Sequence, residues 1–163
     1  MSYNQLKKET SQKYLNRYVP KSLTEKQKEE VSKIILDRRK GKSTKITPSF
    51  DRPSRKSTYT VQFNKRYGDI KDKSIRNLAK YFKIQPLVLN TVYNKASAAW
   101  FTSGSRLGIN REQWSKARVY KGILNILEIR KNGIEKYPQR KKTEGNDYSL
   151  IQKAIQFNSS YIP

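Results

Sequence analysis

The stretch from Lys73 to Arg111 constrains the fold more than any other part of the chain, because helical spacing coincides there with charge of one sign. Its apolar residues recur every three or four positions, which is the period of a helix that buries one face. The stretch contains no Asp or Glu. The sequence therefore predicts helices whose charged residues are all cationic, namely Lys73, Arg76, Lys80, Lys83, Lys95, Arg106 and Arg111.

The whole chain shares this excess of positive charge. Its 163 residues include 36 Lys and Arg against 13 Asp and Glu, which gives a formal net charge of +23. So much charge repels itself in a small body, and it is tolerated where a polyanion or an acidic protein surface compensates it. We therefore expect an acidic partner.

Residue types that are missing narrow the function further. The chain has no cysteine and no histidine, which removes disulfides, thiolate nucleophiles, histidine-based triads and the usual zinc sites. The acidic residues stand mostly in predicted first turns of helices, where capping and the helix dipole account for them. The sequence predicts a non-enzymatic protein with no catalytic residues, no metal, no other cofactor and no small-molecule substrate.

No targeting or membrane segment is visible. The N-terminus lacks an apolar core of signal-peptide length, and nowhere do 18 apolar residues run uninterrupted. We expect a soluble, non-secreted protein without a transmembrane segment, made in a reducing compartment.

The first part of the chain divides into an arm and a helix. Residues 1–20 are polar, basic and without a steady apolar period, which is typical of an N-terminal arm. Residues 21–41 form a helix pattern with two overlapping capping boxes at its start, one of which pairs Thr24 with Gln27. Gly41 is expected to end this helix.

Residues 42–72 lack a clear helical pattern and contain two prolines. Within them Tyr59, Val61 and Phe63 alternate with polar residues, which is the period of a strand. The sequence predicts an extended linker or binding arm here, with a short strand or extended segment.

Residues 73–130 form the predicted helical core, and residues 131–163 a basic loop, a short helix over 147–157 and a polar tail. The predicted fold class is mainly α: a small helical domain of four or five helices, including a hairpin like a helix-turn-helix, with extended basic arms.

The predicted hairpin carries the first candidate function. Apolar residues over 75–82 have helical spacing, Lys83 to Gln85 turn the chain, and Pro86 suits the first turn of a second helix. This spacing resembles a helix-turn-helix, whose second helix lies in the major groove of DNA. An ordinary helical hairpin is the alternative. In the first case the side chains available to bases are Asn90, Thr91, Asn94 and Lys95.

The second candidate site is the stretch "SAAWFTSGSRLGINREQW", in which Trp100 and Trp114 bracket the signature turn, Ser103 to Arg106. The tryptophans are expected to anchor two helices in the core. The turn either joins these helices or forms an anion nest from backbone N–H groups and hydroxyls. The residues expected to bind phosphate or an acidic partner are Ser103, Gly104, Ser105, Arg106, Arg111, Arg118 and Lys95; further basic clusters are Arg38, Arg39, Lys40 and Arg140, Lys141, Lys142.

Three stretches in this order resemble a family found in large nucleocytoplasmic DNA viruses, including algal and giant viruses. The matching residues are Tyr18 to Leu23 ("YVPKSL"), Ser103 to Arg106 of an "SSGSRP" pattern, and Trp114 with Ala117-Arg118 of a "WGxAR" pattern. The resemblance spans residues 18–120. It implies a viral origin and no known activity.

The chain departs from that pattern at Leu107, where proline is expected, and at Ser115, where glycine is usual. With the missing catalytic residue types and the predicted arms, the resemblance predicts a virion structural protein, a minor capsid or internal component that bridges acidic surfaces of other virion proteins. Its expected location is the virion, and the host cytoplasm or nucleus during assembly. The alternative is a protein that binds viral DNA or RNA through the cationic hairpin, in genome packaging or viral transcription.

Overall fold

The computed structural model describes residues 1–50, 57–102, 106–133, 154 and 161–163, and all regular structure within them is helical. This confirms the mainly α fold class, with more helices than the four or five expected. The chain divides into two compact units, Met1–Arg55 with Ser97–Trp114, and Lys56–Ala96 with Ser115–Pro163. The helices are α1 (Ser2–Glu9), α2 (Gln12–Tyr18), α3 (Glu25–Arg39), α4 (Thr58–Tyr67), α5 (Ile75–Phe82), α6 (Pro86–Thr102) and α7 (Arg111–Asn132).

This division cuts across the predicted segments. The predicted core of residues 73–130 contributes to both units, because α6 and α7 each continue from one unit into the other. Most of the predicted segment 131–163 lies outside the described residues, and of the helix expected over 147–157 only Ala154 is described.

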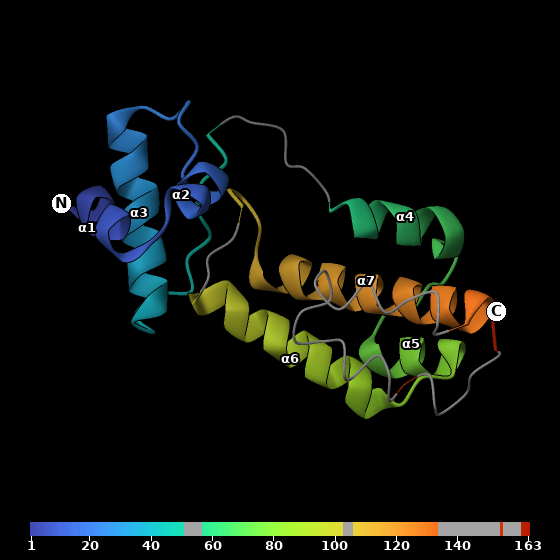
Figure 1. Ribbon diagram of the computed structural model, residues 1–163. Coiled ribbons are helices and arrows are strands. Elements are labelled where there is room, and N and C mark those ends of the chain that lie inside the picture. Colours follow the sequence, from blue (N-terminus) through green and yellow to red (C-terminus); the bar gives the residue numbers. More distant parts are fainter. Residues whose placement is uncertain (51–56, 103–105, 134–153, 155–160) are drawn as a thin grey trace. The chain divides into compact units, whose positions relative to one another are not determined.

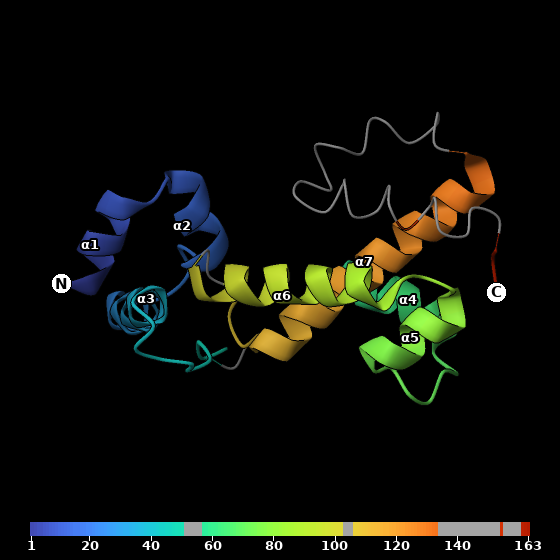
Figure 2. The same ribbon diagram turned by 90° about the horizontal axis from the view of Figure 1, so that it is seen from below.

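The first unit is built on α3, against which α1 packs (Figure 1). Figure 2, which looks along the axis of α3, shows α1 beside it. Leu6 of α1 and Leu15 of α2 join Val31 and Ile35 of α3 in one buried apolar cluster. The prediction of an arm over residues 1–20 is therefore wrong: two short helices, too short to show a steady apolar period, are stabilised by burial against α3.

The ends of α3 follow the local sequence. Thr24 accepts a hydrogen bond from the Gln27 backbone N–H, and the Gln27 side chain accepts one from the Thr24 N–H, so this predicted capping box is confirmed. At the other end Gly41 has φ of +70°, a conformation that costs glycine little. The helix ends where the sequence predicts.

Glu29 of α3 fixes the start of α1. Its carboxylate accepts hydrogen bonds from the backbone N–H groups of Tyr3, at 3.0 Å, and of Ser2. These are two of the N–H groups that have no partner within their own helix. The two bonds lower the pKa of Glu29, with that from Tyr3 the larger cause. An acidic side chain of one helix thus takes the place of a local N-cap in another.

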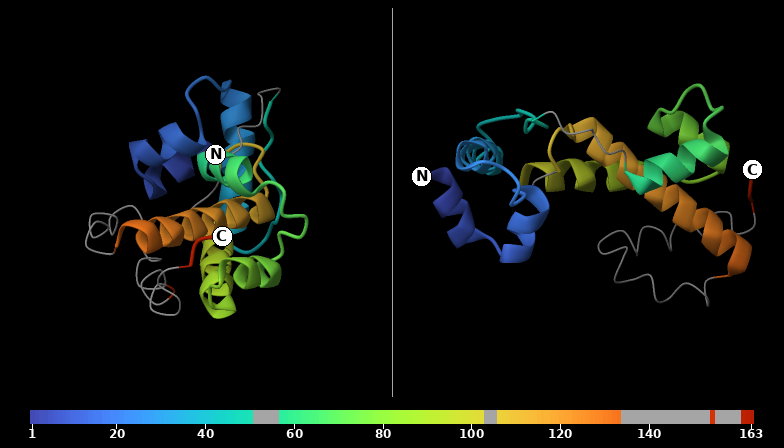
Figure 3. Two further views of the ribbon diagram at one scale, coloured as in Figure 1. Left: turned by 90° about the vertical axis from the view of Figure 1, so that its right-hand side faces the viewer. Right: turned by 90° about the horizontal axis from the view of Figure 1, so that it is seen from above.

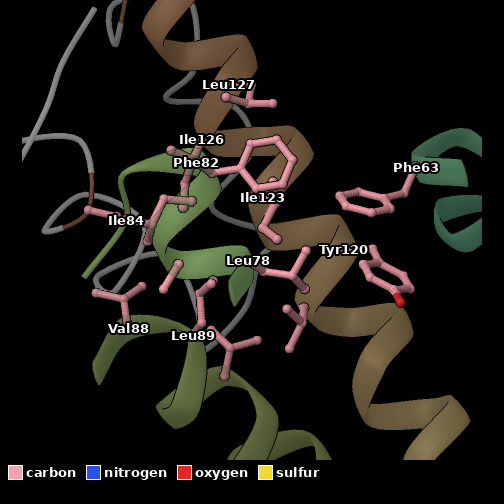
Figure 4. Close-up of a cluster of buried hydrophobic side chains, with 14 of the residues drawn as sticks. Phe63, Leu78, Phe82, Ile84, Val88, Leu89, Tyr120, Ile123, Ile126 and Leu127 are labelled. Atoms are coloured by element: carbon pink, nitrogen blue, oxygen red, sulfur yellow. The ribbon is translucent and has the colours of Figure 1, made fainter. Parts of the chain in front are cut away.

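The second unit has its own apolar core, formed by α4, α5, α7 and the first part of α6. Figure 4 shows Leu78, Phe82 and Leu89 among the side chains of this core, together with Ile123 and Ile126 of α7. Each of these five side chains has no exposed surface. Burying such a side chain contributes about 1.5–3 kcal/mol, so this core determines how α5 and α6 are held.

The structure overturns the strand expected at Tyr59, Val61 and Phe63, which lie in α4. Ser57 caps the helix by accepting a hydrogen bond from the Tyr59 N–H. Phe63 and Tyr67, four residues apart, are its buried residues, and the Phe63 ring stacks on Tyr120 of α7 with centroids 4.3 Å apart. The right-hand view of Figure 3 shows α4 crossing over α7. The segment is helical because a helix buries Phe63 and Tyr67 on one face, although Tyr59, Val61 and Phe63 alternate with polar residues as in a strand.

Candidate nucleic-acid interface

The α5–α6 hairpin, residues 75–95, has the connection that the sequence predicts. Ser74 caps α5 by accepting a hydrogen bond from the Asn77 N–H. α5 is followed by its C-cap residue Lys83, whose φ of 51° and ψ of 54° place it in the left-handed region. The Ile84 N–H then donates to the Ala79 carbonyl at 3.0 Å, and Pro86 begins α6. Three residues therefore turn the chain, as in a helix-turn-helix.

One side of this hairpin is wholly buried. Leu78, Ala79 and Phe82 of α5 are at most 2% exposed, and so are Ile84 in the turn and Leu89 in α6. Their contacts with α7 set the orientation of both helices (Figure 4). The opposite side is therefore the part of the hairpin that is available to a ligand.

Arg130 of α7 holds the turn from inside. Its guanidinium donates to the carbonyls of Phe82 at 2.6 Å, Lys83 at 2.8 Å and Tyr161 at 3.2 Å. These bonds satisfy carbonyls that the end of α5 leaves without helical partners. Burial lowers the pKa of Arg130. The sequence interpretation left Arg130 for solvent or a partner. This is corrected: the residue is 8% exposed, and both terminal nitrogens of its guanidinium donate to backbone carbonyls.

The C-terminal end of the described chain also reaches this turn. The Lys83 ammonium group lies 4.1 Å from the centroid of the Tyr161 ring, within range of a cation–π interaction. Lys83 thus stabilises the fold through its contact with Tyr161. Its charge stays at the surface, since the residue is exposed.

The available face is cationic on α5 and polar on α6. Arg76 and Lys80 of α5 are exposed and form no ion pair within the described part of the chain. Asp72, just before the hairpin, directs its carboxylate to the Ser74 N–H at 2.9 Å, a bond that lowers its pKa. On α6 the face consists of Leu87, Asn90, Asn94 and Lys95, which are exposed, with the half-buried Thr91.

Beside the signature turn, in contrast, the fold holds the side chain of Trp100. Ser103, Gly104 and Ser105 lie outside the described residues. Trp100 is 1% exposed, and its indole N–H donates to the Ile109 carbonyl at 3.0 Å. The Gly108 N–H donates to the Thr47 carbonyl at 2.8 Å. Trp100 is therefore a core anchor, as predicted, whereas Trp114 is only half-buried.

Arg38, predicted as part of a basic cluster, belongs to the same core. Its guanidinium carbon lies 3.6 Å from the centroid of the Trp100 ring, and its Nε donates to the Lys45 carbonyl at 2.9 Å. The residue is 1% exposed, and burial lowers its pKa to about 10, so it stays protonated at neutral pH. Arg38 is part of the packing, and only Lys40 of this cluster is exposed.

The remaining predicted site residues are distributed as follows. Arg39 is half-buried, 3.9 Å from a carboxylate oxygen of Glu9. Arg106 and Arg111 are exposed, and Arg111 lies 5.5 Å from the ring centroid of Phe101. Arg118 is half-buried and engaged in an interaction of its own. The cluster Arg140, Lys141 and Lys142 lies outside the described residues.

The start of α7 matches its predicted capping box. The Asn110 N–H donates to the Gln113 side chain at 3.0 Å, and the Gln113 N–H donates to the Asn110 side chain at 2.8 Å. This reciprocal pair satisfies backbone groups that an anion at this helix end would otherwise engage. It weakens the interpretation of this end as an anion site.

Two features of the hairpin surface went unnoticed in the sequence. Leu87 is 73% exposed although it lies in an apolar run, and Arg130 is buried although it follows the pattern of a surface cation. The position of Leu87, two residues before the buried Leu89, was the available signal, because residues two apart on a helix point in different directions. The position of Arg130 depends on distant carbonyls and gave no local signal.

Within the described part of the chain, no group of three or more Asp or Glu side chains is placed to hold a metal ion. No helix found there is long and apolar enough to cross a bilayer.

Fold and site together define a basic protein whose described regular structure is helical and which exposes the polar side of a helix-turn-helix-like hairpin. The chain belongs to a family of unknown function, DUF5824, whose profile matches residues 11–144. No curated protein and no solved structure gives a significant match.

Proposed function

We propose that this protein binds duplex DNA without catalysing a reaction, and that the α5–α6 hairpin is the contact surface. The observation that carries the proposal is the exposed surface of this hairpin, which includes Arg76 and Lys80 of α5 and the polar residues of α6, with no acidic residue from 73 to 111. The second unit, which contains the hairpin, has 19 Lys and Arg against 6 Asp and Glu, a formal charge of +13.

Two kinds of contact follow from this arrangement. The cations of α5 neutralise backbone phosphates and release condensed counterions, which gives affinity without sequence preference. The polar side of α6 then lies along the base edges, since a major groove of about 12 Å width admits a helix. Duplex RNA is a poorer fit, because its deep, narrow major groove excludes side chains.

Binding of the full chain to a labelled duplex, measured by fluorescence anisotropy against salt, tests the proposal. Each neutralised phosphate contributes about 0.9 to the log–log slope of affinity against salt, so we expect a slope of several units. Arg76→Gln and Lys80→Gln should each lower this slope by about one. Lys26→Gln and Lys33→Gln, which neutralise exposed lysines on α3, are the matched controls and should leave the slope unchanged.

Competition with polyglutamate separates DNA from an acidic protein surface. If the hairpin is specific for DNA, most of the duplex stays bound in the presence of polyglutamate. If it binds any acidic polymer, polyglutamate displaces the duplex. A flat salt dependence, or no duplex binding at about 150 mM salt, contradicts the proposal, since phosphate contacts require a steep dependence.

A structural role in a virus particle is the second proposal. The resemblance to viral proteins supports it, and so does α4, whose Val61 is 51% and Tyr59 39% exposed, because a protein partner would cover such side chains. Packed helices over residues 2–18 and 58–67, where extended arms were expected, remove one of its supports. Purified particles should contain the protein at fixed stoichiometry after stringent washing, and its absence from them would contradict this role.

A further inference from the structure

We infer that α6 prefers A·T base pairs, which it reads in the major groove through Leu87, Asn90, Thr91 and Asn94. This inference rests on the proposed duplex binding and adds a base preference to it. Leu87, Asn90 and Asn94 are exposed, and Thr91 is half-buried beside them. Positions 87, 90, 91 and 94 follow the i, i+3, i+4, i+7 pattern of one helix face, so they form one row along the helix.

The two asparagines supply the polar part of this row. A carboxamide donates to N7 of adenine and accepts from its N6 amino group, a two-bond match that no other base offers in the major groove. Asn90 and Asn94 are four residues apart, about one helical turn. Neither side chain makes a hydrogen bond within the described residues, so both carboxamides are available to a base.

Leu87 and Thr91 supply the apolar part. The Leu87 side chain is 73% exposed at the start of α6, a costly position for a large apolar group without a partner. The Thr91 hydroxyl donates to the Leu87 carbonyl at 2.7 Å, which leaves its methyl group for an outside contact. The C5 methyl of thymine is the one apolar group at the base edges of the major groove.

The side chains that read G·C pairs are nearly absent from α6. Guanine is read by Arg or Lys, and cytosine by Asp or Glu. From Pro86 to Thr102 the helix contains no Arg, Asp or Glu, and Lys95 is its one Lys. Amide and methyl groups on the row, with the cations placed on α5, therefore favour A·T over G·C pairs.

Selection from a duplex library with a randomised centre tests the preference. We expect the enriched duplexes to share a short A·T block, and replacement of one contacted pair by G·C to weaken binding about tenfold. Inosine·cytosine pairs present the minor groove of A·T but the major groove of G·C. They should weaken binding as G·C does, whereas unchanged affinity would place the readout in the minor groove and overturn the inference.

Variants connect the preference to α6. Asn90→Ala with Asn94→Ala should lower affinity for the enriched duplex to that for G·C duplexes and leave the salt slope unchanged. Asn64→Ala, on the exposed face of α4, is the matched control. Uracil in place of thymine should weaken binding by the wild-type protein, and Leu87→Ala should reduce this difference. Circular dichroism confirms that each variant is folded.

The outcomes separate this inference from the proposed function. Salt-dependent binding of all duplexes with equal affinity overturns the A·T preference and leaves duplex binding standing. Enrichment of G·C blocks also overturns the preference. Binding to no duplex overturns both.

Discussion

The α5–α6 hairpin and the surroundings of the signature turn are both cationic in sequence, yet the fold treats their side chains differently. Near the turn, Arg38 is buried against Trp100 and donates to a backbone carbonyl. On the hairpin, Arg76 and Lys80 are exposed and without ion pairs in the described residues. A cluster of cations thus points to a ligand only where the fold has not already used its donors.

Trp100→Ala is expected to give the largest effect and to sharpen this comparison. It removes a side chain that is 1% exposed and the surface on which Arg38 packs, so the free energy of unfolding should fall by about 4 kcal/mol. Chemical denaturation measures the loss. Arg106→Ala, at an exposed position of the same turn, should change stability by less than about 0.5 kcal/mol. Equal losses for both would contradict the structural role of Trp100.

Arg130→Met tests the cation of α7 that donates hydrogen bonds to carbonyls at the hairpin turn. The variant keeps much of the apolar volume but leaves the Phe82 and Lys83 carbonyls without their donor, which should cost about 2–3 kcal/mol. The neighbouring Lys131 is exposed, and Lys131→Met should be nearly neutral in the same denaturation measurement. Little cost at position 130 would mean that the turn does not depend on this cap.

Lys83 combines a structural position with an available charge. Its φ of 51° is unfavourable for a residue with a Cβ atom, so Lys83→Gly should be more stable than Lys83→Ala by about 1 kcal/mol. Both variants lose the contact with Tyr161 and one positive charge, and both should lower the salt slope of duplex binding equally. Different slopes for the two variants would show that the turn geometry, rather than the charge, governs binding.

Protonation of Glu29 is expected to have the smallest effect on stability. This acidic residue stabilises the fold through its hydrogen bonds to the start of α1. Its pKa is lowered in the folded state, so its contribution is present above the pKa of the unfolded chain, about 4.5, and is lost as the pH falls through the folded-state pKa. The protection factors of the α1 amides, which are exchange rates corrected for the intrinsic pH dependence of amide exchange, should therefore fall on acidification. Glu29→Gln should remove most of this pH dependence, and Glu30→Gln, at the exposed neighbour, should preserve it.

The sequence predicts those parts of the fold that local chemistry decides. The capping boxes at Thr24 and Asn110, the end of α3 at Gly41 and the turn from Lys83 to Gln85 all match, since caps and turns depend on residues three or four apart. Residue types and spacing suffice at these positions.

Other parts depend on partners far along the chain and could not be read locally. α1 is fixed by Glu29, whose carboxylate lies 27 positions after Ser2. Arg130 is buried because it meets carbonyls 47 and 48 positions earlier. For the candidate site, the pattern identified the face of α6 but not the exposure of Leu87, because apolar runs in helices are usually buried.

Removal of two charges from each cationic region tests the central claim most directly. Arg76→Gln with Lys80→Gln takes two exposed cations from the hairpin, and Arg106→Gln with Arg111→Gln takes two exposed cations from the surroundings of the signature turn. The measurement is duplex affinity against salt for both double variants. We predict that the hairpin variant loses about two units of slope and at least about tenfold in affinity, while the turn variant matches the wild type. An equal or greater loss in the turn variant would contradict the assignment of the hairpin as the DNA-binding surface.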